Sequence, residues 1–139
     1  MKYMLDTNIC IFIIRQRSLP VLHRIEKTPP GQIAISAITV AELQYGVFKS
    51  SNPEKNAMAL SKFISPFNVL PLTEKDTMIY GKIRSDLERR GNCIGPFDLL
   101  IAAHAISNSL VLVTNNLKEF SRVGGLAAED WHELKSSQK

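Results

Sequence analysis

The chain has 139 residues, 45% of them hydrophobic, which is enough for one compact core but not for two. Its formal net charge of +4 is compatible with a polyanionic partner, although an excess of this size does not by itself indicate one. Two cysteines without a C-x-x-C pair argue against a disulfide framework. Together with the lack of a membrane-length apolar run and of a secretory signal, they favour a cytoplasmic location.

The predicted elements alternate between short apolar strands and helices. The first strand ends at Asp6, and Thr7 and Asn8 are residue types that cap a following helix. Pro53 marks another helix start, and Gly91 marks the end of a long helix. In chain order we expect strands over 3–5, 33–36, 67–72 and 110–114, a short closing strand between 124 and 131, and helices over 9–15, 21–27, 39–49, 53–64, 74–90, 99–106 and 117–120.

This alternation predicts an α/β fold in which a parallel central sheet is covered by helices on both faces. Pro71 interrupts the strand over 67–72, so this strand is expected at an edge of the sheet. The strand over 110–114 is apolar throughout, as interior parallel strands are. No linker or repeat divides the chain, so we expect one domain over residues 1–134 and a frayed tail over 135–139.

Three carboxylates occupy equivalent positions next to strands. Asp6 follows the first strand, Glu42 lies in the first turn of the helix after the second, and Asp98 opens the helix before the fourth. These positions share one edge of a parallel sheet, so we expect the three side chains to converge. Carboxylates gathered in a crevice repel one another, and a hard divalent cation such as Mg²⁺ relieves that repulsion.

Each carboxylate also has a purely structural interpretation. Asp6 could cap the following helix, and Asp98 could offset the dipole at a helix start. Glu42 could form a capping box with Thr39. Three independent caps, however, need not all be acidic and all fall at one end of a sheet, so the joint pattern favours a metal site.

Five stretches of the chain form an ordered set of motifs: Leu5-Asp6-Thr7-Asn8; Ile35-Ser36 with Thr39 and Glu42-Leu43; Ile94-Gly95-Pro96-Phe97-Asp98 with Ile101-Ala102-Ala103; Val113-Thr114-Asn115-Asn116 with Glu119-Phe120; and Arg122-Val123-Gly124-Gly125-Leu126 with Glu129-Asp130-Trp131. Together they resemble the successive motifs of the PIN-domain ribonucleases. The resemblance extends to the bacterial VapC toxins, especially the group known as tRNA(fMet)-specific endonucleases, and covers nearly the whole chain.

The resemblance implies a single PIN-like domain that is the toxin of a type II toxin–antitoxin system and a Mg²⁺-dependent endoribonuclease. Asp6, Glu42 and Asp98 are then the catalytic carboxylates, with Asp6 and Asp98 as ligands of Mg²⁺ or Mn²⁺ that activate a water. The implied substrate is initiator tRNA, cut in the anticodon stem-loop. Supporting roles are expected for Thr7, Asn8, Ser36, Thr114, Asn116 and Glu119.

Asn116 departs from the family pattern, because many PIN domains carry a fourth acid at this point. An amide keeps an oxygen that can hydrogen-bond to a metal-bound water, but it removes one negative charge. Glu119, one turn later, could restore that charge. We therefore expect one firmly held ion rather than two.

The resemblance also implies three kinds of partner besides RNA. They are a VapB-type antitoxin that covers the site, a second copy of the toxin in a homodimer, and operator DNA that is contacted only through the antitoxin. An Arg or Lys from the antitoxin tail could enter the acidic pocket in place of the metal ion. The apolar contacts for the antitoxin are expected from Ile11 to Ile14 and from Val47-Phe48, and no membrane partner is expected.

A group of basic residues flanks the stretches that carry Asp98 and Asn116, with Lys82 among them. One interpretation is an ordinary solvated face. The functional interpretation is that these residues hold RNA phosphates beside an acidic pocket that would itself repel RNA. The candidate RNA-binding residues are Arg84, Arg89, Arg90, Lys118 and Arg122.

The histidines and cysteines are not expected to take part in catalysis. His104 stands six residues after the last catalytic carboxylate, about 240° round a helix, so it points away from it. Neither His23 nor His132 has a partner at ligand spacing. Cys10 and Cys93 are expected to be small buried apolar residues.

Two other functions suit the fold class. A phosphoacceptor receiver domain requires an acceptor Asp after its third strand and a Lys after its fifth. Here the third strand leads into Leu70-Pro71-Leu72-Thr73, and Asn115-Asn116 follows the strand over 110–114, so both requirements fail. A non-catalytic RNA- or protein-binding domain on the same fold stays open, although the presence of all three carboxylates argues against it.

Overall fold

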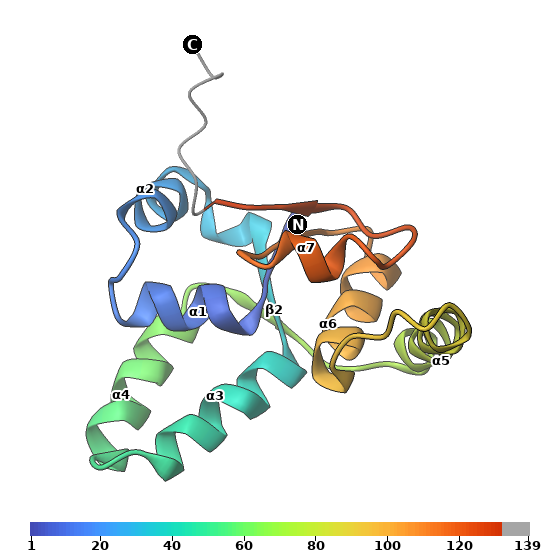
Figure 1. Ribbon diagram of the computed structural model, residues 1–139. Coiled ribbons are helices and arrows are strands. Elements are labelled where there is room, and N and C mark those ends of the chain that lie inside the picture. The colour runs from blue at the N-terminus through green and yellow to red at the C-terminus, as the bar shows by residue number, and fades with distance from the viewer. Residues whose placement is uncertain (132–139) are drawn as a thin grey trace.

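Five short parallel strands form the centre of the computed structural model, which describes residues 1–131 (Figure 1). They are β1 (Tyr3–Leu5), β2 (Ile33–Ser36), β3 (Asn68–Leu70), β4 (Val111–Val113) and β5 (Ala128–Glu129). Their order across the sheet is β3-β2-β1-β4-β5, so the predicted edge position of β3 is confirmed. His132 and the expected frayed tail lie outside the described residues.

Helices connect the strands close to where the sequence predicts them. They are α1 (Thr7–Ile14), α2 (Leu19–Lys27), α3 (Ala37–Lys49), α4 (Pro53–Ile64), α5 (Glu74–Arg89), α6 (Pro96–Ser107) and α7 (Leu117–Phe120), with a short 3₁₀ turn at Pro30–Gln32. α3 begins two residues earlier than expected, because Ser36 Oγ accepts the Ile38 N–H at 3.0 Å and supplies the cap. The alternative interpretation of Thr39 and Glu42 as a capping box is therefore excluded. The expected place of Glu42 in the first turn is also wrong, because it lies in the second turn of α3.

The sheet divides the apolar core into two clusters, one on each face. Leu5 and Ile35 belong to the cluster that α1 to α4 cover, whereas Met4, Ala34 and Leu112 belong to the cluster that α5 to α7 cover. Burial of apolar side chains on both sides of the sheet is the main force that holds these layers together. The predicted covering of both faces by helices is confirmed (Figure 1).

The parallel register aligns the ends of the three inner strands. Leu5 is the register partner of Ile35 in β2 and of Val113 in β4. The residues that come next in each strand therefore leave the sheet side by side at its carboxyl edge, where parallel sheets form their ligand sites. These residues are Asp6, Ser36 and Thr114.

Two side chains lie elsewhere than expected. Val47 is 6% exposed and belongs to the core, whereas its neighbour Phe48 is 77% exposed, so only Phe48 of this pair can meet a partner. Cys10 is buried as predicted, but Cys93 is exposed. Within residues 1–131, no helix is long and apolar enough to span a membrane.

Candidate active site

Asp6 ends β1 and begins α1, and its contacts serve both elements. Its backbone N–H donates to the Val113 carbonyl at 3.0 Å, which joins it to the sheet. Its Oδ1 accepts the Ile9 N–H at 2.8 Å, so Asp6 is the N-cap of α1. The predicted caps Thr7 and Asn8 are wrong, and the structural interpretation of Asp6 is confirmed. A carboxylate has about four lone-pair positions, so capping does not exclude cation binding.

The Asp6 side chain lies in an unfavourable environment for its charge. Burial raises its pKa to about 6, against an ordinary value of 3.8. Hydrogen bonds from the Thr114 hydroxyl and the Ile9 N–H oppose the shift. The negative charges of Asp98 and Glu42 add to it. Near neutral pH the carboxylate therefore carries a charge that its surroundings do not balance, and a bound cation would balance it.

Glu42 reaches the centre from the second turn of α3, where it is half-buried. The Thr7 hydroxyl of α1 donates to Glu42 Oε1 at 2.7 Å and lies 3.1 Å from Thr39 Oγ1. Thr39 is fully buried, so these contacts connect the first turn of α1 to the buried side of α3. Thr7 thereby fixes the orientation of the Glu42 carboxylate.

Asp98 lies in the first turn of α6 and is half-buried. Burial raises its pKa, and the charges of Glu42 and Glu119 raise it further. Asp98 in turn raises the pKa of Asp6, so these carboxylates share one electrostatic environment. The structure thus places the three predicted acids near enough for their charges to act on one another, and their catalytic roles stay a prediction.

Glu119 of α7 is a fourth carboxylate at the centre, because its charge acts on Asp98. Asn116 Nδ2 donates to Glu119 Oε2 at 2.7 Å, and the Asn116 backbone N–H donates to Thr114 Oγ1 at 2.9 Å. Asn116 therefore holds Glu119 through its amide. Glu119 thus places a negative charge near Asp98, and its replacement of a fourth acid stays a prediction.

The donor set suits a hard divalent cation. The groups gathered here offer carboxylate, hydroxyl and amide oxygens, which are the ligands that Mg²⁺ and Mn²⁺ prefer. Among residues 1–131, no three Asp, Glu, His or Cys side chains are close enough together to hold an ion between them. Mg²⁺ usually takes one or two carboxylates and keeps several waters. Asp6 and Asp98 are the candidate ligands.

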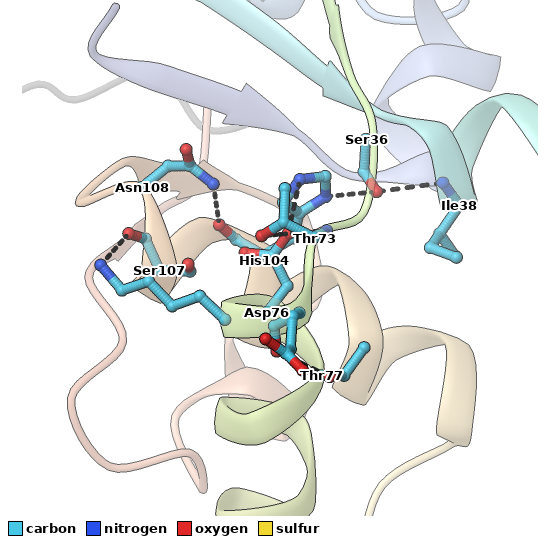
Figure 2. Close-up of polar contacts among 10 residues, drawn as sticks. Ser36, Ile38, Thr73, Asp76, Thr77, His104, Ser107 and Asn108 are labelled. Carbon is cyan, nitrogen blue, oxygen red and sulfur yellow. Dashed lines mark hydrogen bonds and ion pairs between the residues drawn. The ribbon is translucent and has the colours of Figure 1, made fainter.

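The remaining residues with expected supporting roles lie in different surroundings. Thr114 is buried and hydrogen-bonds to Asp6. Asn8 is exposed on α1. Ser36 Oγ lies 2.8 Å from His104 Nδ1 on the side of the sheet covered by α6 (Figure 2). Ser36 therefore contacts His104 through its side chain, rather than one of the carboxylates of the centre.

The basic residues of α5 are engaged mainly with their own helix. Arg84 Nε lies 3.0 Å from Glu88 Oε2, and Arg90 Nη2 lies 2.8 Å from Asp86 Oδ2. Arg89 also donates within the helix. Exposed pairs of this kind add little stability, so phosphate groups can replace them at small cost. RNA binding by these residues stays a prediction.

The other two RNA-binding candidates follow β4. Arg122 Nη1 donates to the Cys93 carbonyl at 3.3 Å, and Arg90 Nη2 donates to the Arg122 carbonyl at 3.2 Å. Arg90 and Arg122 are thus neighbours although they lie far apart in the sequence. Lys118 is exposed on α7, one residue before the carboxylate that acts on the centre.

A second buried polar group, formed by His104 and Asp76, was not apparent from the sequence (Figure 2). His104 Nε2 lies 3.5 Å from Asp76 Oδ2, and both side chains are almost fully buried. The spacing of Thr73 and Asp76 is that of a capping box, which the structure contains, and this signal could have indicated Asp76. Nothing in the sequence indicates that α5 and α6 bring it to His104.

Comparisons with known proteins give a consistent result. The family model for the PIN domain matches residues 3–126. The tRNA(fMet)-specific endonuclease VapC of Shigella flexneri is 46% identical over 131 residues, which are 94% of this chain and 98% of that protein. Ribonuclease VapC2 of Rickettsia felis is 46% identical over 132 residues, with the same shares covered. The crystal structure of DNA-bound VapBC from Salmonella typhimurium matches with a TM-score of 0.90 and 44% identity, over 94% of this chain and 98% of that one.

Proposed function

Because the chain belongs to the VapC ribonucleases of the PIN-domain family, we propose that it is a divalent-metal-dependent endoribonuclease and the toxin of a toxin–antitoxin pair. One observation carries the metal-dependent part of this proposal. Asp6, Glu42 and Asp98 come from three separate elements and act on one another's charge, around a buried carboxyl whose pKa is about 6.

The proposed roles follow from the contacts of these residues. Asp6 and Asp98 would hold Mg²⁺ or Mn²⁺, and the bound ion would supply an activated water and offset charge on the phosphate. The Thr7 hydroxyl orients Glu42 through Oε1, and the Glu42 carboxylate would accept a proton from the attacking water. Glu119, held by Asn116, adds negative charge near the Asp98 ligand.

Cleavage of a labelled RNA in Mg²⁺, in Mn²⁺ and in EDTA tests the proposal. Asp6→Asn and Asp98→Asn remove the charge with little change of shape. A metal contributes several kcal/mol to catalysis, so we expect each variant to lose at least about 100-fold in rate. Glu42→Gln should behave likewise, whereas its matched control Glu54→Gln, at an exposed site on α4, should retain wild-type activity. Full activity in EDTA, or in Asp6→Asn, would contradict the proposal.

The proposed substrate is initiator tRNA, cut in the anticodon stem-loop. The proteins that support this are the VapC of Shigella flexneri and that of Salmonella typhimurium, both named tRNA(fMet)-specific endonuclease, at 46% and 44% identity. The bases of a single-stranded loop are splayed and accessible, which makes loops common targets of RNA recognition. Sequencing of RNA 5′ ends after induced expression should give one dominant cut in this tRNA. Cuts scattered evenly over mRNA would exclude it.

The proposed inhibitor is a VapB-type antitoxin. In the proposed complex the antitoxin alone contacts the DNA, and the toxin forms a homodimer. The solved VapBC2 of Rickettsia felis is bound to a DNA fragment from the promoter, which supports a toxin–antitoxin complex on DNA. Exposed apolar side chains on α3 and α4 offer contact area for a partner. They are Tyr45, Phe48 and Met58, which are 66%, 77% and 75% exposed.

We further propose that an Arg or Lys of the antitoxin competes with the metal ion for the same carboxylates. Asp6→Asn and Asp98→Asn should then weaken antitoxin binding as well as catalysis, while the apolar contacts keep part of the affinity. Calorimetric titration of the antitoxin into each variant measures this. Equal affinity for the variants and the wild type would mean that no cation enters the pocket and that inhibition is steric.

A further inference from the structure

A buried polar network on the α5–α6 side of the sheet joins Ser36, His104 and Asp76 (Figure 2). His104 of α6 is 0% exposed, and its Nδ1 lies 2.8 Å from Ser36 Oγ at the end of β2. On the other side of the ring, Nε2 lies 3.5 Å from Asp76 Oδ2 of α5. The imidazole thus stands between the end of a central strand and the first turn of a helix that covers it.

Asp76 is held as an anion by groups of its own helix and of α6. Its Oδ2 accepts the Thr73 N–H at 2.7 Å and the Thr73 hydroxyl at 3.0 Å. Burial alone would raise its pKa, but hydrogen bonds from Ser107 and Thr73 outweigh burial and lower it. Asp76 therefore presents a negative charge to His104 Nε2.

This charge favours one direction for the hydrogen bond between His104 and Ser36. An anionic Asp76 favours a proton on Nε2 of His104, because a bare nitrogen lone pair would face the carboxylate. Burial lowers the pKa of His104, so the ring is neutral at neutral pH and Nδ1 is an acceptor. The Ser36 hydroxyl must then donate to Nδ1, which leaves its oxygen lone pairs to accept the Ile38 N–H at 3.0 Å.

Ser36 connects the buried network to the acidic centre. Ser36 follows Ile35, the register partner of Leu5, so Ser36 leaves the sheet beside Asp6. Ser36 also caps α3, the helix that carries Glu42 in its second turn. The orientation of the Ser36 hydroxyl therefore bears on both the start of α3 and the edge of the sheet at Asp6.

We propose that His104 is a positioning residue of the acidic centre, which holds the Ser36 hydroxyl as the cap of α3 and thereby places Glu42 against its catalytic neighbours. The residue types are those of a nucleophilic triad, but Ser36 and His104 are both 0% exposed and no substrate can reach them. The Ser36 oxygen is committed to the cap, so its role is structural placement. The inference rests on the proposed function, because the position of Glu42 matters to catalysis only if that function holds.

Two pairs of variants test the proposal. Ser36→Ala removes the donor to His104 together with the cap, whereas Ser36→Thr keeps a hydroxyl at the same position. His104→Leu removes both ring nitrogens, whereas His104→Asn keeps a polar atom near the position of Nδ1. Ser18→Ala is the matched control, because Ser18 is also a buried capping serine, but of α2, which carries none of the centre.

Steady-state cleavage of an RNA oligonucleotide at saturating Mg²⁺, well below the melting temperature of each variant, separates kcat from KM. We expect Ser36→Ala and His104→Leu to lower kcat by about tenfold or more with KM within twofold of wild type. Ser36→Thr and His104→Asn should recover most of kcat. Ser18→Ala should lower the melting temperature but not kcat. Unchanged kcat in Ser36→Ala would overturn the proposal, even if His104→Leu fails to fold.

Two further readouts do not need cleavage. Nitrogen-15 NMR of the wild type should show the neutral ring of His104 with its proton on Nε2, and a proton on Nδ1 would contradict the network. Calorimetric titration with Mn²⁺ should show weaker binding to Ser36→Ala than to Ser18→Ala, and equal binding would argue against placement of the centre. If the wild type does not cleave RNA, the proposed function fails, while these two measurements still test the protonation of His104 and the effect of the Ser36 cap on metal binding.

Discussion

At the scale of single residues, Asp6 combines two tasks that are usually separate. Its Oδ1 caps α1, and its burial among other acids raises its pKa to about 6. A cap gains from a full negative charge at a helix start, whereas burial and like charges oppose that charge. The conflict is relieved when a cation binds, which is why the metal-free and metal-bound states should differ in stability.

The pH dependence of stability should reveal this conflict. The pKa of Asp6 is about 6 when folded and 3.8 when unconstrained, so the folded state binds the proton more tightly. Stability from this group is thus fully present below pH 4 and falls by about 3 kcal/mol as the pH rises to about 6 and beyond. Asp6→Asn should remove that fall and be more stable than wild type at pH 7 in EDTA.

Urea unfolding in EDTA from pH 4 to pH 8 measures the difference between Asp6→Asn and wild type. The difference should grow in favour of the variant as the pH rises. Glu54→Gln, at its exposed site, should follow the wild-type curve. Parallel curves for Asp6→Asn and wild type would show that the Asp6 charge is not destabilising.

Thr7 should matter through the carboxylate that it orients. Thr7→Val removes the hydroxyl that donates to Glu42 Oε1 at 2.7 Å, and we expect about tenfold lower cleavage and a loss of about 1–2 kcal/mol of unfolding free energy. Thr7→Ser should restore both. Thr77→Val is the matched control, because the Thr77 hydroxyl only donates to a backbone carbonyl of its own helix. An effect of equal size in Thr77→Val would contradict a specific role for Thr7.

At the scale of elements, the centre depends on where helices begin. α1 begins at the cap Asp6, α3 at the cap Ser36, and α6 begins at Pro96, two residues before Asp98. Each start lies at the carboxyl edge of the sheet, where the helix N-termini also favour negative charge. The acids therefore lie near one another because the N-termini of their helices lie at the same edge of the sheet.

Two glycines of α5 and its C-terminal end test whether the end of this helix requires a positive φ. Gly91 follows α5 with a φ of 63°, where an alanine is strained, whereas Gly81 lies inside α5 with open space around it. Gly91→Ala should cost about 1 kcal/mol, and Gly81→Ala should stabilise by about 0.5–1 kcal/mol. Urea unfolding of both variants measures the contrast. Equal effects would show that the positive φ is not required.

At the scale of the whole molecule, the acidic centre is positioned by a sheet whose strands have only two to four residues. β1 lies in the middle of the sheet with helices over both faces, so Asp6 has little exposure at the point where it leaves the sheet. α1, α3, α6 and α7 approach this point from both sides of the sheet. Binding of one ion would therefore join elements that belong to different core clusters.

Divalent cations should accordingly stabilise the whole fold. At a metal concentration 100 times the dissociation constant, the free energy of unfolding should rise by about 2.7 kcal/mol. Thermal unfolding across a Mn²⁺ series should show a rising melting temperature for wild type and for Glu54→Gln. Asp98→Asn should show a much smaller rise. A shift of equal size in Asp98→Asn would mean that the ion binds elsewhere.

The sequence alone was sufficient for the order of the elements along the chain and for the parallel sheet, and it indicated three acids whose catalytic roles stay a prediction. Short apolar runs bounded by Pro, Gly and capping residues favour strands of a buried sheet, because helices usually need longer segments. Asp6 was recognisable because it stands where such a run must stop. The edge place of β3 was recognisable because Pro71 cannot donate to a neighbouring strand.

Only the tertiary structure decided which atoms meet. Capping by Asp6 and Ser36 in place of Thr7 and Thr39 depends on how the chain leaves each strand, and several nearby residue types could have served. The approach of Glu119 to the centre and the burial of His104 between Ser36 and Asp76 depend on register and helix packing. These contacts join residues that are far apart in the sequence, and local propensity carries no information about such distances.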